Sequence, residues 1–166
     1  PLPHTLKAKL NAAGVPLLYK AADELHVPYR KTGSLVCAFG AEEEKTLAAL
    51  LARGKENGIP DLKLLSGDAA RAIEPALSAE VTGALLVPSA GVICPYMLTI
   101  AAVGNAMDNG VALLRDFAVC GIARDKDGFT VRAASGDTVR GRFVANCAGG
   151  FADRVSEMAG DDSFTL

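Results

Sequence analysis

The spacing of apolar residues predicts helices that alternate with short strands from the first residues onward. Leucine and alanine recur at helical spacing from about Lys7 to Leu25, but Gly14 and Pro16 interrupt them, so this helix is either continuous or in two pieces. Short alternating or wholly apolar runs predict strands. We expect strands at 32–40, 61–65 and 82–87, and helices at 42–56 and 67–74.

Residues at the predicted helix ends support these boundaries. Glu42 to Glu44 lie in the first turn of their helix, where carboxylates interact favourably with the helix dipole. Ser66 is a favourable N-cap for the following helix. Pro95 and Gly110 bracket a further helix, because Pro is favoured at the first helical position and Gly just past the last. We expect its buried face to consist of Tyr96, Ile100, Val103 and Met107.

The pattern after Gly110 is mostly that of β-structure. VALL, residues 111–114, reads as a short strand, and a β-meander over 119–141 follows. Its turns are predicted at Asp127-Gly128 and at Ser135 to Asp137, because Asp-Gly between alternating strands is a strong hairpin signal.

RFVANCAGG, Arg142 to Gly150, differs in being continuously apolar from Phe143 to Ala148 except at Asn146. Such a run is typical of a strand buried on both faces of a parallel sheet. The only obvious parallel neighbour is 111–114, so the sheet is expected to lack strands. A helix over 151–160 follows, and Asn146, as a buried amide, is predicted to tie the strand to a neighbouring segment.

Composition and charge exclude several classes of function. The 166 residues are 50% hydrophobic and 22% charged, with a net charge of −2 and no basic stripe, so nucleic acid is not an expected partner. No run approaches the roughly 20 apolar residues of a membrane span. The four widely spaced cysteines, without a histidine beside them, do not predict a zinc site or any other metal. We expect a cytoplasmic protein, or a membrane-peripheral part of a larger complex.

Three stretches together resemble a known family: VPYRKTGSLVCAF, AIEPALSAEVTGALLVPSAGVICPYMLTIAAVGNAMDNGV and FVANCAGGFADRVSEMAGDDSF. From about His26 onward the chain resembles FAD-dependent oxidoreductases of the D-amino-acid oxidase superfamily. Within that superfamily it is most similar to the branch of glycerol-3-phosphate dehydrogenases and L-2-hydroxyglutarate oxidase-like proteins.

The resemblance implies a mixed α+β and α/β fold, and a fragment of a two-lobed flavoenzyme. Residues 1–28 would form a connecting helix, 29–94 a substrate-side lobe with an antiparallel sheet, and 95–166 part of a Rossmann-like FAD lobe with a β-meander. The Gly-rich loop for the FAD pyrophosphate would then lie upstream of Pro1, an expectation that agrees with the missing Met at the start. The 166 residues alone are therefore expected to be inactive and not to bind FAD.

The resemblance also implies cofactor contacts at the end of the apolar run and in the meander. Cys147, Ala148, Gly149 and Gly150 would approach FAD, the two glycines because a Cβ would keep the backbone away. The backbone near Val119 would lie against the adenine side.

The implied reaction is hydride transfer from a small hydroxylated or amine substrate to FAD. Glycerol 3-phosphate, a 2-hydroxy acid and an amine all remain open as the substrate, and no catalytic residue is assigned. Arg30 and Lys31 are candidates to bind an anionic substrate, with Thr32, Ser34 and Tyr96 as hydrogen-bonding groups. The alternative for the two cations is a solvated position before a strand.

Two functions without catalysis also fit the sequence. One is a binding module derived from a flavoprotein, and the other is a subunit-contact protein, which the high share of alanine, valine and leucine favours.

Overall fold

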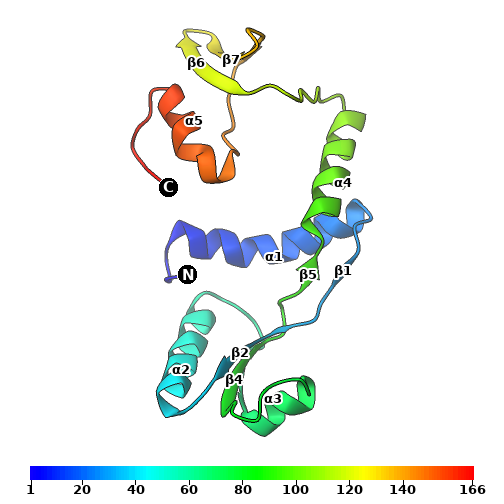
Figure 1. Cartoon of the computed structure of the whole chain (residues 1–166), viewed down its shortest axis with the longest axis vertical. Coiled ribbons are helices and arrows are strands. Elements are labelled where there is room, and N and C mark those ends of the chain that lie inside the picture. The colour runs from blue at the N-terminus through cyan, green and yellow to red at the C-terminus, as the bar shows by residue number, and fades with distance from the viewer. The chain divides into compact units, whose positions relative to one another are not determined.

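The computed structural model describes residues 1–166, which divide into two compact units, Pro1–Val111 and Ala112–Leu166. Figure 1 shows the elements of both units. The first unit contains α1 (Leu6–Glu24), β1 (Tyr29–Arg30), β2 (Ser34–Ala38), α2 (Ala41–Glu56), β3 (Lys63–Ser66), α3 (Gly67–Ile73), β4 (Gly83–Val87), β5 (Val92–Ile93) and α4 (Pro95–Asp108). The second contains β6 (Val119–Asp125), β7 (Gly128–Ala133), β8 (Thr138–Gly141), the 3-10 helix η1 (Gly149–Phe151) and α5 (Ala152–Met158).

A three-stranded antiparallel sheet in the order β2–β4–β3 forms the centre of the first unit. In this register Leu85 of the central strand stands between Val36 of β2 and Leu64 of β3. Helix α2 covers one face of this sheet, where Leu47 packs against Ala38 and Leu85 in a buried cluster. The antiparallel sheet expected in this part of the chain is therefore confirmed.

Local hydrogen bonds at their starts explain why α2 and α3 begin close to where the sequence predicted. The Glu43 carboxylate reaches back and accepts a hydrogen bond from the Phe39 N–H at 2.8 Å, which satisfies a donor just before the first turn. The Ser66 side chain likewise accepts from the Ala69 N–H at 3.2 Å and caps α3. Helix α1 is one continuous helix in spite of Pro16.

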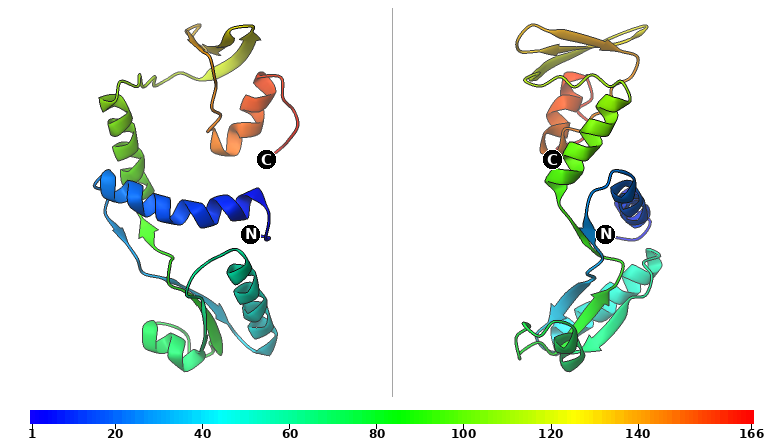
Figure 2. Two further views of the ribbon diagram at one scale, coloured as in Figure 1. Left: turned by 180° about the vertical axis from the view of Figure 1, so that it is seen from behind. Right: turned by 90° about the vertical axis from the view of Figure 1, so that its right-hand side faces the viewer.

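The strand predicted over 32–40 is shorter and preceded by a separate strand. Gly33 has a φ of +70°, which interrupts the extended conformation between β1 and β2. Strand β1 pairs instead with β5, a two-residue strand that the sequence pattern did not predict. Figure 2 shows these two strands side by side in both of its views.

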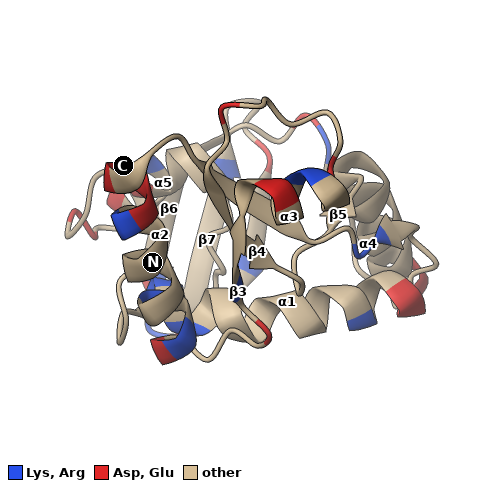
Figure 3. Cartoon of the chain, turned by 90° about the horizontal axis from the view of Figure 1, so that it is seen from below, with Lys and Arg blue, Asp and Glu red and all other residues tan.

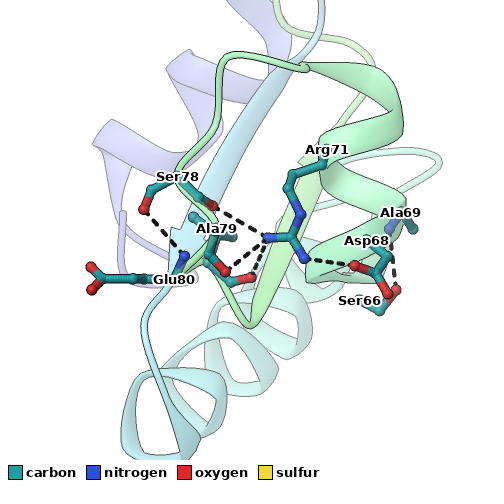
Figure 4. Close-up of polar contacts among 8 residues, drawn as sticks. Ser66, Asp68, Ala69, Arg71, Ser78, Ala79 and Glu80 are labelled. Atoms are coloured by element: carbon teal, nitrogen blue, oxygen red, sulfur yellow. Dashed lines mark hydrogen bonds and ion pairs between the residues drawn. The ribbon is translucent and has the colours of Figure 1, made fainter.

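Arg71 of α3 anchors the loop that leads into β4. Its guanidinium donates to the carbonyl oxygens of Ser78, Ala79 and Val81 at 3.3, 3.3 and 2.9 Å, and it pairs with Asp68 at 2.7 Å (Figure 4). One side chain therefore satisfies three backbone acceptors of a segment that has no regular structure.

Helix α4 departs from its predicted burial. Pro95 and Gly110 bracket it as predicted, but none of its residues is buried. The exposed fraction is 74% for Tyr96, 58% for Ile100 and 51% for Met107, so the predicted buried face is wrong for this chain. The helix makes no extensive contact with another element. Asp108 is its one charged residue, and most of its ribbon is tan in Figure 3. No helix of the chain has both the length and the apolar character to cross a bilayer.

The second unit is built on the predicted meander. Strands β6, β7 and β8 pair antiparallel in sequence order, and Asp125 stands opposite Gly128 at the first turn. Arg140 of β8 forms an ion pair with Asp125 at 3.0 Å. Helix α5 packs against β6.

Two predicted strands do not form. Residues 111–114 have no strand structure, and neither does the apolar run 143–148, whose Phe143 is 85% exposed. A strand needs backbone hydrogen bonds to a neighbour, and neither segment has such a neighbour in this chain. Both segments are apolar, but the pairing that would make either of them a buried strand is absent.

Replacing Arg71 tests the role of its backbone contacts. Arg71→Ala is expected to lower the free energy of unfolding by about 1–3 kcal/mol, because three carbonyl groups lose a charged donor. Urea unfolding followed by circular dichroism measures the change, with Arg115→Ala as the matched control because Arg115 forms no ion pair. Equal stability of the two variants would contradict the assignment.

Candidate functional site

The short β1–β5 ladder positions the predicted substrate-contact residues. Tyr29 stands opposite Ile93 and Arg30 opposite Val92. Because the pairing is antiparallel, the chain after Arg30 runs away from the start of α4. Tyr96 and Ser34 therefore lie at opposite ends of the ladder, so the structure does not gather all five predicted residues around one point.

Lys31 lies over the rings of two tyrosines. Its Nζ atom is 4.7 Å from the ring centroid of Tyr19, in α1, and 5.9 Å from that of Tyr29. The rings contact each other at a centroid distance of 4.9 Å with an interplanar angle of 40°. Lys31 forms no ion pair with a carboxylate. The ammonium is thus positioned by aromatic faces, and its charge is available to an anion.

Hydrogen bonds fix both tyrosines. The Tyr19 hydroxyl donates to the Ser89 carbonyl oxygen at 3.0 Å, and the Tyr29 hydroxyl donates to Oδ2 of Asp23 at 3.3 Å. The second bond raises the pKa of Tyr29 above its ordinary value, because the carboxylate favours the protonated phenol that donates to it. A cavity of about 240 Å³ adjoins the pair and is lined also by Val15, Leu18, Ser89, Ala90, Gly91, Val92 and Ile93.

The sequence did not point to Tyr19 and Tyr29. The chain has three tyrosines, and these two supply the surface on which Lys31 rests. Proximity of Tyr29 to Lys31 in sequence was a usable signal, whereas Tyr19 comes from a different element and only the packing of α1 brings it there.

The other predicted substrate contacts are less constrained. Arg30 is exposed and has no carboxylate partner. The Thr32 hydroxyl donates to the carbonyl oxygen of the adjacent Gly33, and Ser34 is exposed in β2 opposite Val87. Tyr96 projects from the first turn of α4 into solvent.

Gly149 and Gly150 form an open turn after the apolar run. Gly149 has a φ of +57°, a conformation that favours glycine, and a Cβ placed at either position would meet no atom within 4 Å. The N–H groups of these two residues have no acceptor in the chain, as expected at the start of a helical segment. The turn therefore presents bare backbone donors beside open space. Helix α5 is only seven residues long, so its dipole contributes little.

Asn146 links this turn to the segment that follows it, as predicted, but it is exposed and not in a strand, so its predicted burial is wrong. Its Nδ2 donates to the Ala152 carbonyl oxygen at 2.7 Å, and its Oδ1 accepts from the Ala148 N–H at 3.2 Å. The amide links both sides of the glycine pair. Cys147, next to it, is an exposed free thiol.

Val119 lies at the free edge of the meander. It pairs with Ala133, and the Ala134 N–H donates to the Ala118 carbonyl oxygen beside this pair. Val119 and Ala133 are thus a non-hydrogen-bonded pair, so the N–H and C=O of Val119 point away from β7. Since β6 is an edge strand, these groups are open to a ligand. Nowhere does the chain gather three or more side chains that could hold a metal ion.

The comparisons with known proteins agree on one family. Residues 1–165 match the family model described as FAD dependent oxidoreductase. A glycerol 3-phosphate dehydrogenase of Caloramator mitchellensis is 37% identical over 164 residues, which cover 99% of this chain and 34% of that protein. The mitochondrial L-2-hydroxyglutarate dehydrogenase of Mus musculus is 33% identical over 169 residues, covering 95% and 36%. The chain thus spans about a third of the length of these relatives.

A solved structure supports the same relationship. The dithionite-reduced L-alpha-glycerophosphate oxidase from Mycoplasma pneumoniae, with FAD bound, superimposes with a TM-score of 0.90 at 27% identity. The match covers 99% of this chain and 44% of that chain. Both the fold class and the family expected from the sequence are confirmed.

The raised pKa of Tyr29 provides a test of the geometry around Lys31. Tyr29 is expected to titrate above the ordinary tyrosine value of about 10, and Asp23→Asn is expected to return it toward that value because the charged acceptor is lost. NMR titration of ring-labelled tyrosine follows the ionisation. Glu24→Gln is the control, since Glu24 contacts Lys20 instead. A raised value that survives in Asp23→Asn would show that the bond is not its cause.

Proposed function

The chain belongs to the family of FAD-dependent oxidoreductases. We propose that it forms part of a flavoenzyme that oxidises a small hydroxylated or amine substrate. The match of the family model over residues 1–165 carries this proposal. Tyr29 to Cys94 would form the substrate-side lobe and Pro95 onward part of the FAD lobe, in a protein located in the cytoplasm.

The backbone around Gly149 and Gly150 fits a role in holding FAD. The open space beside both Cα atoms and the two unused N–H donors suit an approach by a polar part of the cofactor. Cys147 and Ala148 would lie beside it, and the outward-facing backbone of Val119 would contact the adenine side. When bound, FAD supplies the acceptor for the hydride. The residues of this chain would position the cofactor through backbone groups.

Lys31 is the strongest candidate in this chain for binding an anionic substrate. The names of two relatives specify glycerol 3-phosphate and L-2-hydroxyglutarate, which are both anions. The Lys31 ammonium has no carboxylate partner and rests on two tyrosines that are themselves hydrogen-bonded. A cation held in this way loses less side-chain freedom on binding an anion than a fully mobile lysine does. Arg30, one residue earlier, would add a second positive charge at longer range.

A subunit contact is the second candidate, because the apolar side chains of α4 are exposed. Large apolar side chains gathered on one helix are typical of protein–protein interfaces. A subunit contact does not exclude catalysis, so an activity assay tests the catalytic role by itself.

Activity should be measured on the complete product of the reading frame that contains this sequence. With FAD, this protein is expected to reduce an acceptor dye when given glycerol 3-phosphate, L-2-hydroxyglutarate or a small amino acid. The 166-residue chain alone is expected to leave the dye oxidised, since it has no Gly-rich phosphate loop. A complete product that binds no flavin and oxidises none of the three substrates would overturn the proposal and leave the subunit-contact role.

Substitution of Gly150 tests the cofactor contact separately from folding. A Cβ at Gly150 meets no atom of this chain within 4 Å, so Gly150→Ala should leave the melting temperature of the 166-residue chain unchanged. If the backbone approaches FAD there, the added methyl group is expected to weaken FAD binding about tenfold or more, in line with the 1–3 kcal/mol cost of overpacking.

Flavin titration followed by fluorescence measures this affinity. The control is Gly136→Ala in the turn between β7 and β8, where a Cβ also meets no atom but the φ of +95° makes the substitution strained. It should lower stability without changing FAD affinity. Unchanged FAD affinity in Gly150→Ala would remove this residue from the cofactor site.

A further inference from the structure

Arg53 is a partly buried cation without a partner. It lies on α2, and its guanidinium makes no hydrogen bond to the protein and no ion pair. Glu56, one turn further along the same helix, is the nearest acidic residue in sequence, but its Oε1 pairs with Nε2 of His4 at 3.1 Å. A guanidinium removed in part from water is stabilised by an anion, and the chain supplies none here.

Arg53 lines an apolar cavity in the first unit. The cavity has a volume of about 320 Å³ and lies between α1, α2 and the β2–β4 face of the sheet. Leu50, Leu62, Leu85 and Val87 form much of its wall. This volume is at the lower end of the range for small-molecule sites, which are mostly apolar with a few polar groups that fix orientation.

The polar groups around Arg53 suit one end of a ligand. Asn11 and Asn57 also line the cavity, and Nδ2 of Asn57 donates to the Pro1 carbonyl oxygen at 3.1 Å. No acidic residue lines the cavity. The wall thus combines the guanidinium of Arg53, two amides and a large apolar surface, and Pro1, which bears the N-terminal amino group of these 166 residues, also lines it.

We propose that this cavity binds a small amphipathic monocarboxylate, with the carboxylate on Arg53 and the apolar body against the leucines. A carboxylate accepts two parallel hydrogen bonds from a guanidinium, and its single charge matches that of Arg53. A phosphate monoester carries about 1.5–2 negative charges at neutral pH, so Arg53 alone would leave part of its charge unpaired in apolar surroundings.

This site is separate from the proposed substrate contact at Lys31. The cavity beside Tyr19 and Tyr29 shares only Val15, Ser89 and Ala90 with this one, and Arg53 does not line it. Binding at Arg53 therefore does not depend on the proposed oxidation, and the two proposals can fail independently.

Titration with octanoate tests the proposal on the 166-residue chain. Chemical shifts of the Leu and Val methyl groups are expected to change saturably, with the largest changes at Leu50, Leu62, Leu85 and Val87. Arg53→Gln is expected to weaken octanoate binding about tenfold to a hundredfold, the effect of losing a hydrogen bond to a charged group. Arg53→Lys retains the charge and should bind more tightly than Arg53→Gln.

Two controls separate the charge from non-specific apolar binding. 1-Octanol has the same apolar body without the charge, and its affinity should be equal in the parent chain and in Arg53→Gln. Lys55→Gln removes a cation from the same helix that does not line the cavity and should leave octanoate binding unchanged. Failure of octanoate to shift these methyl groups, or equal octanoate affinity in Arg53→Gln and the parent, would overturn the proposal.

Discussion

The pairing of β4 with both β2 and β3 is the constraint on which the first unit depends. β4 is the central strand, and its residues Gly83, Ala84 and Leu85 are buried. Its pairing brings β2 and β3 to one sheet although α2 separates them in sequence, and it creates the surface that Leu47 covers. Arg71 then holds the loop before β4 through three carbonyl groups. The chain after β4 leads directly into β5, so this sheet also sets the position of the β1–β5 ladder.

Lys31 and Arg53, the two cations for which ligands are proposed, differ in their surroundings. Lys31 is exposed and rests on the rings of Tyr19 and Tyr29, which suits contact with a soluble anion that enters and leaves. Arg53 is partly buried beside apolar side chains, where an unpaired charge is costlier. The two cations differ in how far they are removed from water. We therefore infer a polar substrate at Lys31 and an amphipathic ligand at Arg53.

The second unit is suited to binding through its backbone. Gly149, Gly150 and the outer edge of β6 at Val119 all present N–H or C=O groups that no protein group uses. Asn146 keeps the glycine turn in shape with two hydrogen bonds to its flanks. Because such contacts would use no particular side chain, we infer them from the family resemblance, and residue chemistry alone gave little indication of them.

The sequence by itself determined the elements whose ends are set locally. It predicted α2 and α3 nearly to the residue because Glu43 bonds to the backbone just before its own helix and Ser66 caps α3. It predicted the meander because the Asp127-Gly128 turn is a local signal. Only the tertiary structure decided what depends on distant partners. The run 143–148 stays unpaired and the apolar face of α4 stays exposed, since periodicity indicates which residues are apolar and cannot indicate what covers them. The contact of Lys31 with Tyr19 likewise exists because α1 packs beside β1, a juxtaposition that no local pattern encodes.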